Sequence, residues 1–168
     1  MMTNANKTLK HLKSIVPETE HYGNVYSVVI NVDGFEYCGK AHLHPDDVDF
    51  ESELVGYTIA HIRAIKKALV AYRDCAEIEY FVANQLLTDI TQNQDPEKVD
   101  PTFKLRKKVY HTKKVWTDYQ VAVRTTQEAL KKYLNNQDKA ITSIKRQREL
   151  QDKANLVFYL FFYYLLRR

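Results

Sequence analysis

Residues 25–44 read VYSVVINVDGFEYCGKAHLH, and no other stretch of the chain indicates its local structure so clearly. Two runs rich in Val, Ile, Tyr and Phe, which are typical of strands, flank the dipeptide Asp33-Gly34. Asp-Gly between such runs favours a two-residue type I′ turn, because that turn needs positive φ at both central positions. The pattern predicts an antiparallel hairpin with these pairs: Val32 with Phe35, Ile30 with Tyr37, Val28 with Gly39, Tyr26 with Ala41 and Asn24 with Leu43.

One face of this predicted hairpin is apolar, so we expect it to pack on a helix, since a lone two-stranded hairpin is marginally stable. The next segment supplies that helix. Between residues 50 and 92, apolar residues recur at spacings of three and four and no proline intervenes. The segment is either one long helix or two helices joined near Asp74. A shorter helix is expected before the hairpin, ending ahead of Pro17.

A second helical region follows the polar residues 93–101, which prolines bracket and which we interpret as a linker. Residues 135–138, Asn-Asn-Gln-Asp, predict a break, followed by a final helix over 139–166. Residues 156–166 are eleven consecutive apolar or aromatic residues, about half the length that a membrane-spanning helix needs. We therefore expect this run to be buried in the bundle core or across a subunit interface, as a homo-oligomer contact, and we expect no membrane association.

These elements predict an α+β fold that is mostly α, with an N-terminal β-hairpin packed on a helix and a long-helix bundle after it. The charge divides along the chain, because residues 1–100 carry a net charge of −7 and residues 101–168 a net charge of +11. We expect an acidic hairpin-plus-helix unit over 1–92, the linker 93–101, and a basic helical unit over 102–168 with an aromatic C-terminal helix.

Histidines on the hairpin form the one candidate metal site. His42 and His44 are two residues apart on a strand, so their side chains point to one face with Cα atoms about 6–7 Å apart. If the preceding strand continues past Gly23, His21 lies at the same corner, near Asp46. Imidazoles with a carboxylate can hold zinc in tetrahedral geometry. The alternative is a solvated polar face whose acidic residues cap the next helix.

Basic residues gather in the early part of the second helical region, with aromatic residues among them. Lys and Arg neutralise phosphates and aromatic rings stack on bases, so this helix, residues 104–132, is a candidate nucleic-acid contact. The alternatives are a solvated helix face and a contact with an acidic protein. The candidate binding residues are Arg106, Lys107, Lys108, Lys113 and Lys114.

Motifs for catalysis are absent from the sequence. It contains no G-x-S-x-G, no glycine-rich phosphate loop and no C-x-x-C pair, so we expect a binding protein and not an enzyme. The two cysteines, Cys38 and Cys75, fit free thiols in a reducing cytosol.

The segment around the predicted turn resembles small accessory proteins of phages and prophages of Gram-positive bacteria. The resemblance lies in Asp33-Gly34, in residues 39–47 (GKAHLHPDD) and in Arg63-Ala64. It implies a phage accessory role in the cytoplasm of a bacterial host. Some such proteins inhibit host defence, including anti-CRISPR proteins that bind an effector nuclease.

Our leading hypothesis is accordingly an anti-CRISPR-like inhibitor that binds a defence effector stoichiometrically and blocks its engagement of nucleic acid. The acidic half of the chain would then fit a basic channel by mimicking nucleic acid. The alternative hypothesis is a phage accessory protein that itself binds nucleic acid through the basic helix 104–132.

Overall fold

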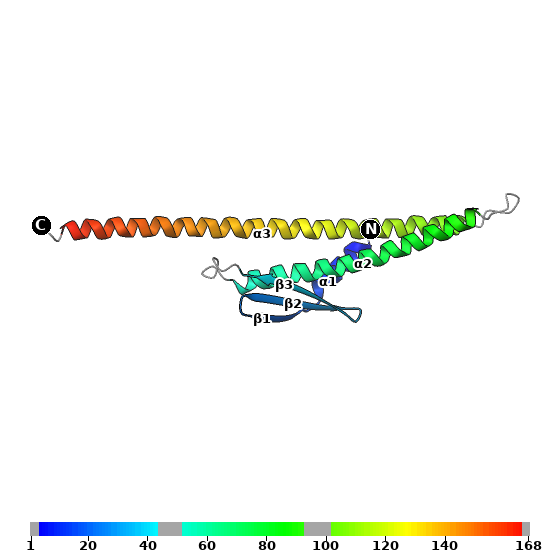
Figure 1. Cartoon of the computed structure of the whole chain (residues 1–168), viewed down its shortest axis with the longest axis horizontal. Helices are drawn as coiled ribbons and strands as arrows, with labels where there is room; N and C mark the ends of the chain where they lie inside the picture. Colours follow the sequence, from blue (N-terminus) through cyan, green and yellow to red (C-terminus); the bar gives the residue numbers. More distant parts are fainter. Residues whose placement is uncertain (1–3, 44–51, 93–101, 166–168) are drawn as a thin grey trace.

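The computed structural model describes residues 4–43, 52–92 and 102–165, with side chains as far as residue 157. These described residues form one short helix, three strands and two long helices, in that order, and the predicted class, α+β and mostly α, is confirmed. The sheet lies against the first half of α2, and α3 runs back alongside α2 and projects well past it (Figure 1). The elements are α1 (Asn4–Ser14), β1 (Glu18–Tyr22), β2 (Val25–Val32), β3 (Phe35–His42), α2 (Glu53–Gln92) and α3 (Phe103–Leu165).

The predicted hairpin forms in the predicted register. Val32 pairs with Phe35 and Ile30 with Tyr37, and the amide of Leu43 donates a hydrogen bond of 2.9 Å to the carbonyl of Asn24. Both turn residues have positive φ, 53° at Asp33 and 81° at Gly34, as a type I′ turn requires. Local turn chemistry therefore sets the register of β2 and β3.

A third strand, β1, adds to the hairpin and was not predicted. The sheet is antiparallel in the order β1-β2-β3, and Tyr22 pairs with Val25 across the two-residue turn Gly23-Asn24. Gly23 has a φ of 57° while Asn24 is not in the left-handed region, the pattern of a type II′ turn. The expectation that the strand continues straight past Gly23 is wrong, because the chain reverses there.

Close backbone approach joins the sheet to α2. A Cβ on Gly39 would overlap the carbonyl oxygen of Ala60 and the amide nitrogen of Ala64, and one on Gly56 would overlap the ring of Tyr26. Small residues on both sides thus let the strands lie directly on the helix. The contact buries these side chains completely or nearly so: Tyr26, Val28, Ile30, Val32, Ala41, Ala60, Ala64 and Ala68.

The segment 53–92 is one helix, α2, with no joint near Asp74. Aromatic rings line its contact with α3: Tyr72 stacks on Tyr119 with centroids 5.7 Å apart, and Tyr80 stacks on Trp116 at 5.4 Å. The short helix α1 packs on the same pair of helices and ends before Pro17, as predicted. A single cluster of buried side chains therefore includes residues from all three helices and from the sheet.

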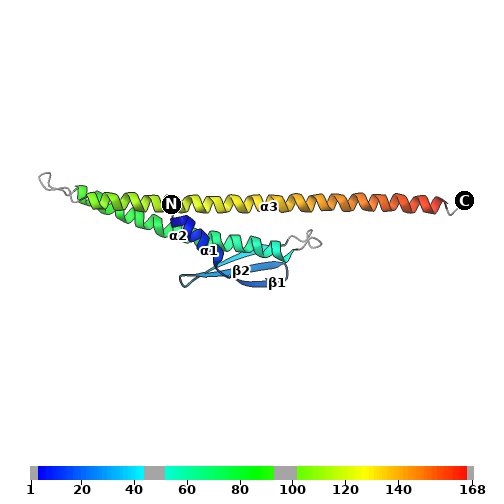
Figure 2. The same ribbon diagram turned by 180° about the vertical axis from the view of Figure 1, so that it is seen from behind.

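The predicted break at residues 135–138 is wrong, because α3 is continuous over 63 residues, a length of about 95 Å. Asn and Asp lower helix propensity by well under 1 kcal/mol each, and without Gly or Pro this does not end a helix. The second half of α3 projects from the body in both views (Figures 1 and 2).

The start of the aromatic run is exposed. Leu156 and Val157 are 59% and 67% exposed, so burial of the run in the bundle core is not found at these two residues. The other side chains of 156–166 lie outside the described part of the chain, and association through them stays a prediction. Over the residues described, no helix has a stretch both long and apolar enough to cross a membrane.

Candidate nucleic-acid interface

The predicted histidine corner is not assembled as expected. His21 pairs with Tyr26 in the β1–β2 register, and its ring stacks on the Tyr26 ring with centroids 4.3 Å apart. Tyr26 faces α2, whereas His42 pairs with Val25 and points to the opposite face of the sheet. The predicted placement of His21 beside His42 is therefore wrong, and its physical cause is the reversal of the chain at Gly23.

His44 and Asp46, the other two candidate zinc ligands, lie outside the described residues. Within residues 4–43, 52–92 and 102–165, no three His, Cys, Asp or Glu side chains gather in a way that could hold a metal ion. Zinc binding through His42, His44 and Asp46 stays a prediction.

The predicted basic residues of α3 divide between two faces of the helix. Arg106, Lys107, Lys113 and Lys114 are exposed, and their spacing places them on the side turned away from α2. Lys108 is also exposed but borders a groove that it shares with residues of α2.

The aromatic residues among these basic residues are also divided between the outward face of α3 and the face that packs on α2. Tyr110 is 71% exposed and lies among the basic residues on the outward side. Trp116 and Tyr119 instead pack against α2, where Tyr119 is buried. Of these three rings, only Tyr110 is therefore positioned to stack on a base.

A basic groove that sequence reasoning missed lies where the edge of the sheet meets the helices. This sheet-edge groove has a volume of about 490 Å³ and no acidic residue in its lining. The guanidinium of Arg63 donates a hydrogen bond to the backbone carbonyl of Lys40, which joins α2 to the edge strand β3. The groove is lined by Lys40, Arg63, Lys66, Lys67, Val70 and Leu130.

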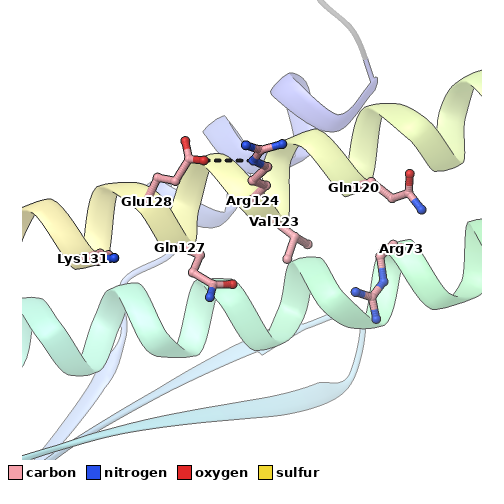
Figure 3. Close-up of a pocket in the computed structure, with 7 residues that line it drawn as sticks. All are labelled: Arg73, Gln120, Val123, Arg124, Gln127, Glu128 and Lys131. Atoms are coloured by element: carbon pink, nitrogen blue, oxygen red, sulfur yellow. Dashed lines mark hydrogen bonds and ion pairs between the residues drawn. The ribbon is translucent and has the colours of Figure 1, made fainter.

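A second groove adjoins the first along the same two helices. This inter-helix groove, about 430 Å³, is lined by Arg73, Gln120, Val123, Arg124, Gln127, Glu128 and Lys131 (Figure 3). Val70 and Arg73 are less than one turn apart in α2, and Leu130 and Lys131 are consecutive in α3, so the two grooves follow one flank. We call the two together the basic flank.

Two ion pairs moderate the charge of the inter-helix groove. Arg124 pairs with Glu128 at 2.9 Å, drawn dashed in Figure 3, and Arg73 pairs with the adjacent Asp74 at 2.6 Å. Such surface pairs contribute about 0–1 kcal/mol and exchange readily with water or another anion. Seven cations and one lining carboxylate leave the basic flank strongly positive.

The projecting part of α3 carries a further row of exposed basic residues, on a different face of the helix from the basic flank. Exposed basic residues recur there at seven-residue spacing, which keeps them on one slowly winding face of the helix. They are Lys132, Lys139, Arg146 and Lys153. Lys132 directly follows the groove residue Lys131 and so lies about 100° around the helix from it, which makes this row a separate positive surface.

One half of the basic flank has a signal in the sequence. Arg63, Lys66, Val70 and Arg73 are three or four residues apart and so share one face of α2. The net negative charge of residues 1–100 obscured this local positive face. Lys40 has no such signal, since only the docking of β3 on α2 brings it to the groove.

Comparison with known proteins identifies no relative: no family model, no curated protein and no solved structure matches the chain.

Proposed function

We propose that this chain is a non-enzymatic protein that binds nucleic acid through the phosphate backbone. The observation that carries the proposal is the basic flank, where seven cations from β3, α2 and α3 line two adjoining grooves with one acidic residue among them. Cations that line a groove neutralise successive phosphates and release bound counterions, which drives association. The exposed basic residues and Tyr110 on α3 would lengthen the contact.

The experiment is a binding titration by fluorescence anisotropy with labelled single-stranded DNA, duplex DNA and RNA of about 30 nucleotides. The affinity should fall linearly on a log–log plot as salt rises, with a slope of roughly −0.9 per neutralised phosphate for duplex DNA. The variant Lys66→Glu/Lys67→Glu, placed in the sheet-edge groove, should weaken binding about tenfold or more at a given salt concentration and make the slope shallower.

The matched control is Lys10→Glu/Lys13→Glu, which makes the same change in net charge at exposed positions of α1. Binding through the basic flank predicts a much smaller loss in this control. No binding to any of the three nucleic acids at low salt, or equal losses in the two double variants, would contradict the proposal.

A second candidate function is a phage-encoded inhibitor that binds a host defence effector, such as a CRISPR nuclease, in the host cytoplasm and blocks its engagement of nucleic acid. The sheet favours it, because Glu18, Glu20 and Glu36 are exposed and their register places them together on the face turned away from α2. The resemblance of residues 39–47 to phage accessory proteins also supports it.

Titration of purified CRISPR effector nucleases with the chain tests this second candidate. Inhibition of DNA cleavage should reach its end point at a fixed molar ratio and should be lost in Glu18→Lys/Glu20→Lys. The Lys66→Glu/Lys67→Glu variant should inhibit as the parent does. Inhibition that disappears instead in the basic-flank variant, and that excess DNA relieves, would assign the effect to nucleic-acid binding.

A further inference from the structure

Residues 103–114 of α3 repeat one arrangement of side chains after seven residues. In each copy an aromatic residue is followed, three and four positions later, by two basic residues. Positions three, four and seven apart lie on one side of an α-helix, so the two copies form one surface, and all six side chains are exposed. We call this surface the aromatic-basic face, and it consists of Phe103, Arg106, Lys107, Tyr110, Lys113 and Lys114.

The aromatic-basic face is turned away from the body of the molecule. Tyr119 is buried against Tyr72 of α2, and its hydroxyl lies 2.9 Å from that of Thr8 in α1. Nine residues make about two and a half turns of an α-helix, so Tyr110 lies on the side of α3 opposite Tyr119. Phe103 and Tyr110 are accordingly 73% and 71% exposed. Both rings are therefore open to a ligand from outside the described structure.

The aromatic-basic face adjoins the basic flank along α3. Eighteen residues make about five whole turns of an α-helix, so Lys113 lies on the same side of α3 as Lys131. Arg106 likewise lies on the side of Arg124. Both Arg124 and Lys131 line the inter-helix groove, and Gln120 lines it nearer to Lys113. A strand whose phosphates lie in the basic flank can therefore continue directly onto the aromatic-basic face.

The charges and the rings of this face fit a single strand of nucleic acid. Residues 102–117 contain six Lys or Arg and no Asp or Glu, so phosphates are attracted to it. The two rings are about 10 Å apart along the helix axis, at 1.5 Å per residue. Aromatic rings stack on unpaired bases of any identity, whereas a base inside a duplex is stacked between its neighbours. The rings therefore add affinity for a single strand and not for a duplex.

A membrane surface fits the same face less well. A helix that lies in a membrane interface presents a continuous apolar side opposite its basic side. Among the described residues 103–121, the exposed large apolar side chains are Phe103, Tyr110 and Val121, and basic residues separate the first two. The face thus lacks the apolar strip that insertion into lipid requires.

We propose that the aromatic-basic face recognises single-stranded DNA or RNA by stacking unpaired bases on Phe103 and Tyr110, an inference that rests on the nucleic-acid binding proposed above. The basic residues of the face hold the phosphates beside the rings. The phosphates of the same strand continue along the basic flank. The rings thus decide the class of nucleic acid, and the cations of the two surfaces supply the attraction to the backbone.

Fluorescence anisotropy with the purified full chain tests the stacking. The probes are labelled strands of thymidine, of uridine and of abasic deoxyribose phosphate, and a DNA duplex, each of about 20 nucleotides, longer than the sites of single-strand binders. The parent should bind the thymidine or the uridine strand more tightly than the abasic strand. Phe103→Ala and Tyr110→Ala should each weaken that binding about fivefold or more. Their affinities for the abasic strand and the duplex should stay those of the parent.

Two controls separate stacking from charge and from folding. Tyr110→Phe keeps the ring and should bind as the parent does. Tyr22→Ala removes a ring that is 88% exposed on the edge strand β1, and it should also bind as the parent does. The salt dependence should keep its slope in Tyr110→Ala, because no phosphate contact is lost, and should become shallower in Lys113→Glu/Lys114→Glu.

The outcomes distinguish the failure of stacking from the failure of nucleic-acid binding. Ring variants that bind both single strands as the parent does, or that lose equal affinity for the single strands and the abasic strand, would overturn stacking while phosphate binding by the basic flank stands. A parent that binds none of the four probes would overturn both. Co-sedimentation with vesicles of phosphatidylserine and phosphatidylcholine tests the competing ligand. Ring-dependent binding to these vesicles, without ring-dependent binding to either single strand, would overturn stacking and assign the face to a membrane surface.

Discussion

At Gly39 a single missing side chain permits the contact between the sheet and α2. Any Cβ there would overlap backbone atoms of Ala60 and Ala64, which cannot rotate away as a side chain would. We predict that Gly39→Ala lowers the free energy of unfolding by about 1–3 kcal/mol, the usual cost of overpacking a tight core. Urea denaturation measures it.

The neighbouring Lys40→Ala serves as the control for Gly39→Ala, because its side chain is exposed and no core contact is changed. It should stay within about 0.5 kcal/mol of the parent. Equal stability of Gly39→Ala and the parent would show that the sheet does not lie as close to α2 as the structure has it.

Tyr72 connects the tip of the β2–β3 hairpin to the helices. Its hydroxyl donates a hydrogen bond of 2.5 Å to Asp33, and its ring stacks on Tyr119, whose hydroxyl lies 2.9 Å from the Thr8 hydroxyl. Burial first, and then the hydrogen bond and charge of Asp33, raise the pKa of Tyr72 above its ordinary value.

We predict that Tyr72→Phe lowers the free energy of unfolding by about 0.5–1.5 kcal/mol, since it removes one hydrogen bond and keeps the ring. Asn also adopts positive φ readily, so Asp33→Asn keeps the turn. It is the second substitution of a double-mutant cycle with Tyr72→Phe. A coupling energy of zero between the two substitutions in chemical denaturation would refute the contact.

His61 makes stability depend on pH. Its Nε2 atom is buried and has no hydrogen-bond partner among the described residues, and this burial lowers its pKa from 6.5. The unfolded chain therefore binds a proton at His61 more readily than the folded chain does. The contribution of neutral His61 to the free energy of unfolding is fully present above about pH 6.5. It is lost as the pH falls toward the lowered pKa.

The prediction is that His61→Gln, which cannot titrate, loses less unfolding free energy than the parent between pH 7.5 and pH 5. Parallel denaturation curves across this range measure the difference. Identical pH dependences in the two proteins would mean that His61 is as solvated in the folded chain as in the unfolded one.

At the scale of elements, α3 divides into a packed half and an unpacked half although its backbone is continuous. The buried residues of α3 end at Thr126, whereas Ile144 and Leu150 are exposed on a helix with no neighbour in the described structure. Helices without tertiary contacts are marginally stable in water. The two halves should therefore differ in local opening.

We predict that amide hydrogens of residues 140–157 exchange much faster than those of residues 112–126. Hydrogen–deuterium exchange followed by mass spectrometry resolves both segments. Addition of a nucleic acid that binds should slow exchange in the projecting half, if its basic face takes part. Equal protection of the two halves in the free chain would contradict the prediction that the projecting half of α3 lacks tertiary packing.

At the scale of the whole molecule, the core lies at one end and the projecting helix adds nothing to it. A chain truncated after Leu134 keeps every buried side chain that the structure describes. We predict a change in melting temperature of less than about 4 °C, which corresponds to about 1 kcal/mol for a domain of this size. Circular dichroism at 222 nm measures it.

Truncation after Lys114 provides the contrast, because it removes Tyr119, Ala122 and Val123 from the core. That chain should melt far below the parent or not fold. Similar melting temperatures for the two truncated chains would contradict the placement of α3 on α2.

Local patterns were enough for the elements whose structure depends on residues near in sequence. Asp33-Gly34 determined a turn type and with it the register of β2 and β3, and apolar spacing determined α2. Strand β1 could be predicted in the same way, because Gly23-Asn24 is also a turn dipeptide between two short runs. The helix continues through residues 135–138 because Asn and Asp only weaken a helix, whereas Gly or Pro would interrupt it.

The candidate site depends on distances that sequence spacing does not contain. Lys40 is 23 residues from Arg63, and only the close approach of β3 to α2 places both in one groove. His21 differs, because a local turn at Gly23-Asn24 pairs β1 with β2 and places His21 opposite Tyr26, away from His42. Helices and turns follow from steric contacts and hydrogen bonds between residues that are near in sequence, so sequence patterns predict them. Which charged faces meet, and which apolar faces stay open, follows from how those elements bury one another's surfaces, and only the tertiary structure decides that.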